Sequence, residues 1–143
     1  MIAIDTNLLV YAHRSGLPEH RRSQRAIEKA SRNPRGWGIA LPCLSEFWSV
    51  VTHPTAAGRP STAREATRFL DALIEGAGAQ IWLPGAGTWR RLEQLAGQLD
   101  VRGPRIFDLQ IAVIASDQGA TELWTHDASF LSVAGLRIVD PLA

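Results

Sequence analysis

Short apolar runs alternate with longer stretches of helical periodicity along the whole chain. The runs have the length and flanking turn residues of strands, and we expect strands at residues 2–4, Trp37 to Leu41, Gln80 to Leu83, 121–125 and Leu136 to Val139. The intervening stretches predict helices at residues 6–13, 18–33, Pro42 to about His53, from an N-cap at Ser61 to about Glu75, 87–99 and 105–118. This order predicts an α/β fold whose central, mostly parallel sheet of about five strands is flanked by helices.

Size and composition limit the class of protein. The chain has 143 residues, of which 45% are apolar, and this fits one globular domain over residues 1–143. Its one cysteine, Cys43, excludes an internal disulfide and a multi-cysteine zinc site, and is expected to be a packing residue. An apolar run directly after Met1 leaves no room for a signal peptide, and no apolar stretch approaches a membrane span. We therefore expect a cytoplasmic protein with no membrane contact.

The net charge of +1 hides an uneven distribution. Residues 1–71 carry ten basic and six acidic side chains, whereas residues 72–143 carry five basic and eight acidic ones. All basic residues but one are arginine, whose planar guanidinium fits phosphate better than an ammonium group does. The basic half is a weak indication of a polyanionic partner, and composition alone favours a simply solvated surface.

Three residues that commonly cap helices, Asp5, Thr6 and Asn7, follow the first predicted strand. Sites in parallel sheets lie at the carboxyl ends of strands, where the loops open. Asp5 is therefore either the N-cap of the next helix or a ligand. Position alone slightly favours the cap, although one cap does not require three such residues in a row.

Asp108 lies in the first turn of a helix that is apolar on nearly all sides. A carboxylate buried among such neighbours must be neutralised, paired or bound to a metal ion. The helix dipole stabilises an anion at this end by roughly 0.3–1 kcal/mol, which is less than the burial of a charge can cost. An ion pair with Arg105 and a cation site are about equally good interpretations.

Two further acids, Asp127 and Glu46, complete the set. Asp127 follows a strand and could cap the turn of residues 128–130, while the hydroxyl of Thr125 could orient a carboxylate or a water. Glu46 projects from the side opposite the apolar stripe of its helix, which is the pattern of a solvated glutamate. That stripe consists of Leu44, Phe47, Trp48 and Val51.

Other catalytic patterns are missing from the sequence. The four histidines lack the i, i+4 arrangement with a glutamate that a helical zinc-protease site requires. No Walker A loop, dinucleotide-binding glycine pattern or G-x-S-x-G nucleophile elbow occurs. Four tryptophans are predicted mostly for the core rather than for a row of base-stacking side chains: Trp37, Trp82, Trp89 and Trp124.

With these residues in place, the sequence resembles the PIN-domain ribonucleases, and within them the small VapC-type toxins of bacterial toxin–antitoxin pairs. The matching segments are Asp5-Thr6-Asn7, Glu46, Arg105-Ile106-Phe107-Asp108 at a helix start, and Thr125-His126-Asp127 followed by Phe130. Each segment alone is a weak signal, whereas the ordered set is fairly specific and covers essentially the whole chain. The part between Glu46 and Asp108 matches no family pattern, so the helices predicted there rest on periodicity.

The resemblance implies a metal-dependent endoribonuclease that hydrolyses RNA phosphodiester bonds and leaves 5′-phosphate and 3′-hydroxyl ends. The acids that would converge on Mg²⁺ or Mn²⁺ are Asp5, Glu46, Asp108 and Asp127. Asn7 and Thr125 would hold carboxylates and water in place. Oxygen ligands without histidine or thiolate independently suit such a hard cation. Glu46 is either a ligand or the group that deprotonates the attacking water, and the number of ions stays open.

The resemblance implies that basic residues of the segment 14–35 bind the RNA backbone next to the cleaved phosphodiester bond. The candidates are Arg14, Arg21, Arg22 and Arg25. Arg105, which lies close before Asp108, could meet the scissile phosphate or pair with an acid. The alternative for the segment is a solvated helix face with pairs such as Arg25 with Glu28.

The resemblance further implies a homodimer, a tRNA or rRNA substrate, and a VapB-type antitoxin whose extended C-terminal segment crosses the acid-lined groove. The alternative is a catalytically inactive PIN domain that binds RNA or protein, although the presence of all four acids argues against it. A phosphotransfer domain of the receiver type also carries acids at strand ends. It needs a lysine near them, and the one lysine, Lys29, falls in the basic helix.

Overall fold

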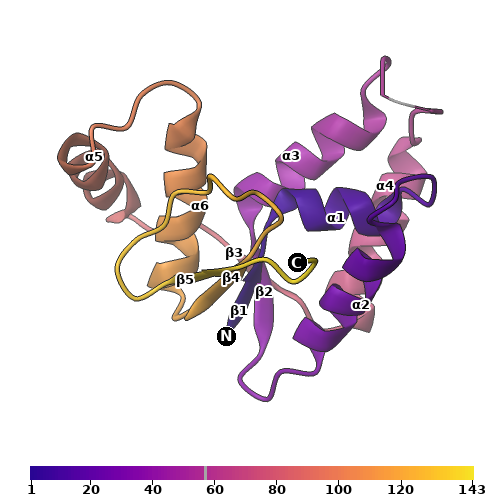
Figure 1. Ribbon diagram of the computed structural model, residues 1–143, viewed down its shortest axis with the longest axis horizontal. Coiled ribbons are helices and arrows are strands. Elements are labelled where there is room, and N and C mark those ends of the chain that lie inside the picture. The colour runs from indigo at the N-terminus through magenta and orange to yellow at the C-terminus, as the bar shows by residue number, and fades with distance from the viewer. Residues whose placement is uncertain (57) are drawn as a thin grey trace.

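A five-stranded parallel sheet runs through the centre of the computed structural model, which describes residues 1–56 and 58–143 (Figure 1). Its strands are β1 (Ile2–Ile4), β2 (Trp37–Ala40), β3 (Gln80–Trp82), β4 (Glu122–Trp124) and β5 (Arg137–Val139). The order across the sheet is β3-β2-β1-β4-β5, and every neighbouring pair is parallel. The predicted α/β fold is confirmed.

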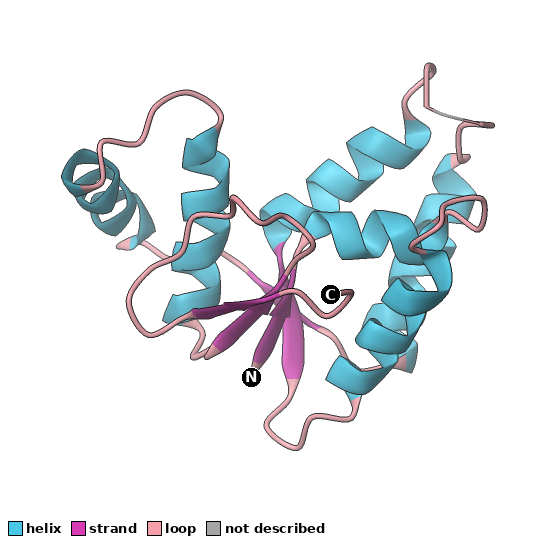
Figure 2. Cartoon of the chain, in the orientation of Figure 1, coloured by secondary structure: helices cyan, strands magenta, loops and turns pink. Residues whose placement is uncertain are grey.

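Helices cover both faces of this sheet (Figure 2). They are α1 (Thr6–His13), α2 (His20–Ser31), α3 (Leu41–Thr52), α4 (Ala63–Asp71), which continues into the π-helix η1 (Ala72–Gly76), α5 (Thr88–Gln98) and α6 (Arg105–Asp117). Figure 1 shows α5 and α6 on one side of the strands and α1, α2 and α4 on the other. Within the described residues, none of these helices combines the length and hydrophobicity needed to cross a membrane.

The inner strands are apolar on both faces because helices pack on both faces. Ile4 of β1 and Ile39 of β2 are almost fully buried, and α6 adds Leu109 and Ile114 to the same core. Burial from two sides is the usual condition of strands in a parallel sheet. It explains why the strands appear in the sequence as short apolar runs rather than as alternating patterns.

The strand order creates a topological switch between β1 and β4. The chain moves outward from β1 through β2 to β3, and then crosses back to place β4 on the other side of β1. The register pairs Ile4 with Trp124, so the residues that follow these two strands come side by side. In open α/β sheets, ligands bind at such a point, outside the carboxyl ends of the strands.

The predicted N-cap of α4 is wrong by one residue. Thr62 caps the helix, because its side chain accepts from the Glu65 N–H while the Glu65 carboxylate accepts from the Thr62 N–H. The Ser61 side chain is buried instead and lies 2.8 Å from Nε2 of His13 on α1.

Two tryptophans also differ from the prediction. Trp37, Trp82 and Trp124 are buried as expected, but Trp89 is 60% exposed because the buried face of α5 is formed by other positions. Trp48 is 40% exposed and lies beside the buried stripe of α3 rather than within it. The spacing of apolar residues in the sequence therefore predicts a wider buried face for α3 and α5 than the structure has.

Gly38 of β2 lies against the indole of Trp82 on the neighbouring strand. A Cβ at this position would come within 2.9 Å of the Gln80 carbonyl oxygen and closer still to the indole. We expect Gly38→Ala to lower the free energy of unfolding by about 1–3 kcal/mol, the usual cost of overpacking, in a urea denaturation experiment. In Gly97→Ala, the control within α5, the new Cβ meets nothing within 4 Å, so stability should hold or rise slightly. Equal midpoints for the two variants would contradict this expectation.

Candidate active site

Asp5 lies directly after β1 and is almost completely buried, with 7% of its surface exposed. Its Oδ1 accepts the Thr6 N–H at 2.7 Å, so the carboxylate is the N-cap of α1. The buried thiol of Cys43 packs beneath it, with Sγ 3.9 Å from the same oxygen. The cap occupies one carboxylate oxygen and leaves the other, Oδ2, to face the neighbouring strand.

The hydroxyl of Thr125 meets that second oxygen. Thr125 follows β4, is 1% exposed, and donates to Asp5 Oδ2 at 2.7 Å. Its oxygen also accepts from Nδ2 of Asn7 at 2.9 Å and from the N–H of Asp127 at 3.1 Å. One buried hydroxyl thus connects two of the predicted acids and one of the predicted positioning side chains.

Asn7 ties the first turn of α1 to the loop after β4. Its Nδ2 lies 3.5 Å from Asp5 Oδ2 in addition to its contact with Thr125, and its Oδ1 accepts the His126 N–H at 3.2 Å. Both ends of the amide are therefore engaged. The structure places Asn7 and Thr125 against the carboxylates, as the resemblance implies.

Glu46 reaches the same region from α3, although its helical position is that of a solvated residue. Its Oε2 accepts from the Thr6 hydroxyl at 3.1 Å, which holds the glutamate at the start of α1. The side chain is exposed. The α3 helix begins directly after β2, so its first turns lie at the carboxyl edge of the sheet, next to α1.

Asp108 occupies the first turn of α6 and is partly buried. Burial raises the pKa of its carboxyl, and the nearby negative charges of Asp127 and Glu46 act in the same direction. The alternative ion pair with Arg105 is wrong, because within the described residues that guanidinium makes no ion pair and donates to the Ser129 carbonyl at 2.9 Å. Arg105 still acts through space and partly offsets the rise.

Asp127 caps the turn that follows it, through Ser129. Its Oδ1 accepts from both the N–H and the hydroxyl of Ser129, at 2.9 and 2.7 Å, and these bonds lower the pKa of Asp127. The predicted capping of the turn after β4 is therefore confirmed. The Asp-x-Ser spacing was the available signal, since short polar side chains commonly bond the backbone two residues ahead.

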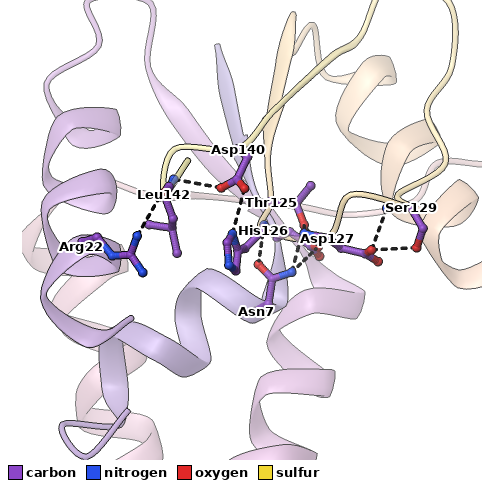
Figure 3. A network of polar contacts seen from close by, with 9 residues as sticks. Asn7, Arg22, Thr125, His126, Asp127, Ser129, Asp140 and Leu142 are labelled. Carbon is purple, nitrogen blue, oxygen red and sulfur yellow. Dashed lines mark hydrogen bonds and ion pairs between the residues drawn. The ribbon is translucent and has the colours of Figure 1, made fainter. Parts of the chain in front are cut away.

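A chain of polar contacts extends from this loop to α2 (Figure 3). The ring of His126 lies 2.8 Å, Nδ1 to Oδ2, from Asp140, whose other oxygen accepts the Leu142 N–H at 2.9 Å. The Leu142 carbonyl in turn accepts from Arg22 at 2.8 Å. Because His126 also donates its N–H to Asn7, residues after β5 and a side chain of α2 help to fix the loop that carries Asp127.

The basic side chains of residues 14–35 fall into two groups. Arg14 and Arg22 donate hydrogen bonds to backbone carbonyl groups, Arg14 to those of Val51 and Arg59 and Arg22 to that of Leu142. Their guanidinium groups therefore stabilise contacts within the fold. Arg21 and Arg25 are exposed on α2 and form no ion pair within the described residues.

The alternative that Arg25 pairs with Glu28 is wrong. Glu28 pairs instead with Arg32, at 2.5 Å, one turn further along α2. This leaves the Arg25 guanidinium exposed beside Arg21. Arg25 lines two surface hollows, one shared with Arg21 and the other with Arg22.

The four acids form an electrostatic cluster rather than a tight cage. Burial raises the pKa of Asp5 to about 6 against the lowering effect of the Thr125 and Thr6 bonds, and the charges of Glu46 and Asp108 add to the rise. None of the four takes part in an ion pair with a basic side chain within residues 1–56 and 58–143. In the same part of the chain, no three His, Cys, Asp or Glu side chains are close enough to hold one ion by themselves.

This open arrangement fits a magnesium-type cation. Mg²⁺ keeps several of its waters and takes one or two carboxylates, so it does not need a closed cage of protein ligands. The donors here are all oxygen atoms, and a buried carboxylate without a cationic partner is the environment that a divalent ion relieves.

Comparisons with known proteins identify the family that the chain matches. The model of the PIN domain family matches residues 2–136. The chain is 32% identical over 142 residues to VapC ribonuclease Mb2897 of Mycobacterium bovis, covering 99% of this chain and 96% of that protein. Ribonuclease VapC43 of Mycobacterium tuberculosis matches with the same identity and coverage.

Solved structures share the fold. VapBC2 from Rickettsia felis, bound to a DNA fragment from its promoter, superposes with a TM-score of 0.69 at 20% identity over 97% of this chain and 98% of that one. Mycobacterium tuberculosis VapC20, described as a sarcin-ricin loop cleaving toxin, gives 0.68 at 15% identity over 91% and 92% of the two chains.

The raised pKa of Asp5 makes stability depend on pH in a defined direction. Its folded value of about 6 lies above the ordinary value of 3.8, so the folded state binds the extra proton between these pH values. The contribution of Asp5 to stability is therefore fully present below pH 4 and is lost as the pH rises through 6. We expect the metal-free wild type to lose about 2 kcal/mol relative to Asp5→Asn between pH 4 and 7.5 in urea denaturation.

Asp71→Asn, which alters an exposed carboxylate on α4, is the control and should follow the wild type at every pH. A difference between wild type and Asp5→Asn that stays constant across this range would contradict the expectation.

Proposed function

The chain belongs to the PIN-domain family, and from that premise we propose that it is an Mg²⁺- or Mn²⁺-dependent endoribonuclease, the toxin of a toxin–antitoxin pair. The observation that carries the proposal is the buried Asp5 carboxylate at the switch between β1 and β4. It has like-charged Glu46 and Asp108 as neighbours and lacks a basic partner among the described residues. The folded structure brings these negative charges together although they repel one another, which is a property of sites that bind a cation.

One or two of the carboxylates of Asp5, Asp108 and Asp127, which different elements keep in place, would hold the ion together with bound waters. A bound Mg²⁺ or Mn²⁺ would supply the positive charge that stabilises the developing charge on the phosphate and lowers the pKa of water. Thr125 fixes Asp5 and the start of the Asp127 loop through one hydroxyl, and Ser129 fixes the Asp127 carboxylate itself.

Glu46 is suited to take the proton of the attacking water. The Thr6 hydroxyl fixes one of its oxygens, while the exposed side chain leaves the other within reach of solvent and substrate. Arg105 keeps its guanidinium at the edge of the acids through the Ser129 carbonyl. From there it can meet a phosphate that approaches Asp108.

The partners follow from the same premise. The structural neighbours include a VapBC assembly and FitAB bound to a DNA fragment, and we propose a VapB-type antitoxin and a homodimer for this chain. The substrate would be tRNA or rRNA, and the place of action the cytoplasm.

Cleavage of a mixed tRNA and rRNA pool by the purified protein with Mn²⁺ tests the activity. We expect Asp5→Asn to reduce the cleavage rate at least about 100-fold, because a weakened cation site loses positive charge at the reacting phosphate and loss of one such preorganised stabilising interaction typically costs that much. Asp71→Asn is the matched charge control and should cleave like the wild type. If wild type and Asp5→Asn leave the pool equally intact, the nuclease proposal fails and a non-catalytic binding module takes its place.

We further propose that the exposed Arg21 and Arg25 of α2 contact RNA backbone. Their joint replacement by alanine should weaken RNA binding and reduce the slope of log K against log salt by about 1.4, roughly 0.7 for each lost phosphate contact. Arg90→Ala, which removes a charge paired with Glu93 on α5, is the control. An unchanged salt slope in the double variant would assign both arginines to solvent.

A further inference from the structure

A groove of about 760 Å³ opens beside the acids, between the start of α3, the first turns of α6 and the loop after β3. It shares Glu46 and Asp108 with the candidate active site, so the groove and the site are continuous. Of the residues that line the groove, the proposed chemistry uses only Glu46, Asp108 and Arg105. The rest of the groove has no role in that chemistry.

The groove contains an aromatic side chain that the fold leaves uncovered. Phe107 lies on the first turn of α6, immediately before Asp108, and is 60% exposed. The sequence predicted a helix buried nearly all round, and this position contradicts that prediction. Leu41, at the opposite wall, is 40% exposed. An exposed apolar patch of this kind, next to polar groups, marks a contact surface.

The remaining walls combine flat apolar surfaces with two free polar groups. Pro42, Pro84 and Ile111 line the groove, together with the hydroxyl of Ser45 and the carboxamide of Gln110. Neither of these polar side chains forms a hydrogen bond within the described part of the chain. A mostly apolar cavity with a few placed donors and acceptors is the usual form of a site for a small, partly polar ring.

We propose that this groove binds the base of an unpaired nucleotide adjacent to the scissile phosphate, stacked on Phe107 and hydrogen-bonded by Ser45 and Gln110. The inference rests on the proposed nuclease function. Single-stranded RNA is recognised by stacking splayed bases on aromatic side chains and by bonding their edges. The substrate class is therefore RNA with an unpaired nucleotide at the cut, such as a loop, rather than a continuous duplex.

Continuity with the acids favours a nucleotide as the occupant. A phosphodiester held at Asp108 carries a base on each side within one nucleotide's reach, and the groove begins at that residue. The base is uncharged, so it can lie beside Glu46 and Asp108 without repulsion, while Arg105 attracts the neighbouring phosphate. A segment of a partner protein is the competing occupant, and the experiment below distinguishes it.

The test uses short RNAs spanning a cut site mapped on total cellular RNA, with an abasic nucleotide placed in turn on each side of the cut. We expect Phe107→Ala to raise KM at least about 5-fold, the lower end of what stacking one base contributes. Phe107→Trp, which keeps a stacking surface, should restore KM. At one position, the abasic substrate should abolish the difference between wild type and Phe107→Ala.

A binding measurement separates this inference from the catalytic proposal. With Ca²⁺ in place of Mg²⁺, 2-aminopurine at the position found above should lose fluorescence on binding to the wild type but not to Phe107→Ala. Trp89→Ala is the control, since Trp89 is an equally exposed aromatic side chain outside the groove.

Three outcomes would overturn the inference. Cleavage by Phe107→Ala with unchanged KM and unchanged abasic sensitivity would overturn it while leaving the nuclease function intact. A Phe107→Ala variant that loses only its affinity for the antitoxin would also overturn it, because the groove would then be the binding site of a protein segment. If the wild type yields no cut site on total cellular RNA, both proposals fail together.

Discussion

The hydrogen bond from the Thr125 hydroxyl to the buried Asp5 carboxylate is the contact on which the site depends. It exists because β1 and β4 are parallel neighbours in register, so the residues after Ile4 and Trp124 meet at one edge of the sheet. Asn7 and the start of the Asp127 loop are attached directly to this contact, whereas Glu46 is held by the Thr6 hydroxyl and Asp108 by its place in α6. The relative positions of Asp5 and Thr125 are therefore set by the paired strands β1 and β4.

The four acids are held near one another at a cost to the fold. For Asp5, burial and the negative charges of Glu46 and Asp108 favour protonation, and the hydrogen bonds from Thr125 and Thr6 oppose it. A protein selected for stability alone would replace such a carboxylate with a neutral or apolar residue. The buried carboxylate of Asp5, which lies at the end of β1 without a basic partner among the described residues, is therefore the clearest functional signal in the structure.

Much of the fold could be predicted from the sequence, because apolar periodicity reports burial directly. The strands, the helices and the positions of Asp5 and Asp127 after β1 and β4 all follow from it. Glu46 could not be placed in this way, since its helical face is polar and only the packing of α3 beside α1 brings it to Thr6. The exposure of Phe107 was also missed, because its apolar side chain lies in a helix whose sequence is apolar on nearly all sides and only the packing of α6 shows which positions are covered.

The switch between β1 and β4 also determines when the site can form. Asp5 and Thr125 are 120 residues apart, so their contact closes one of the longest loops in the chain. Contacts of such high sequence separation form late and slow the folding of a domain. A nascent chain has no complete cluster of acids until β4 has been synthesised and inserted beside β1. Local separation of β4 from β1 would also be enough to disassemble the site while β1, β2 and β3 stay paired.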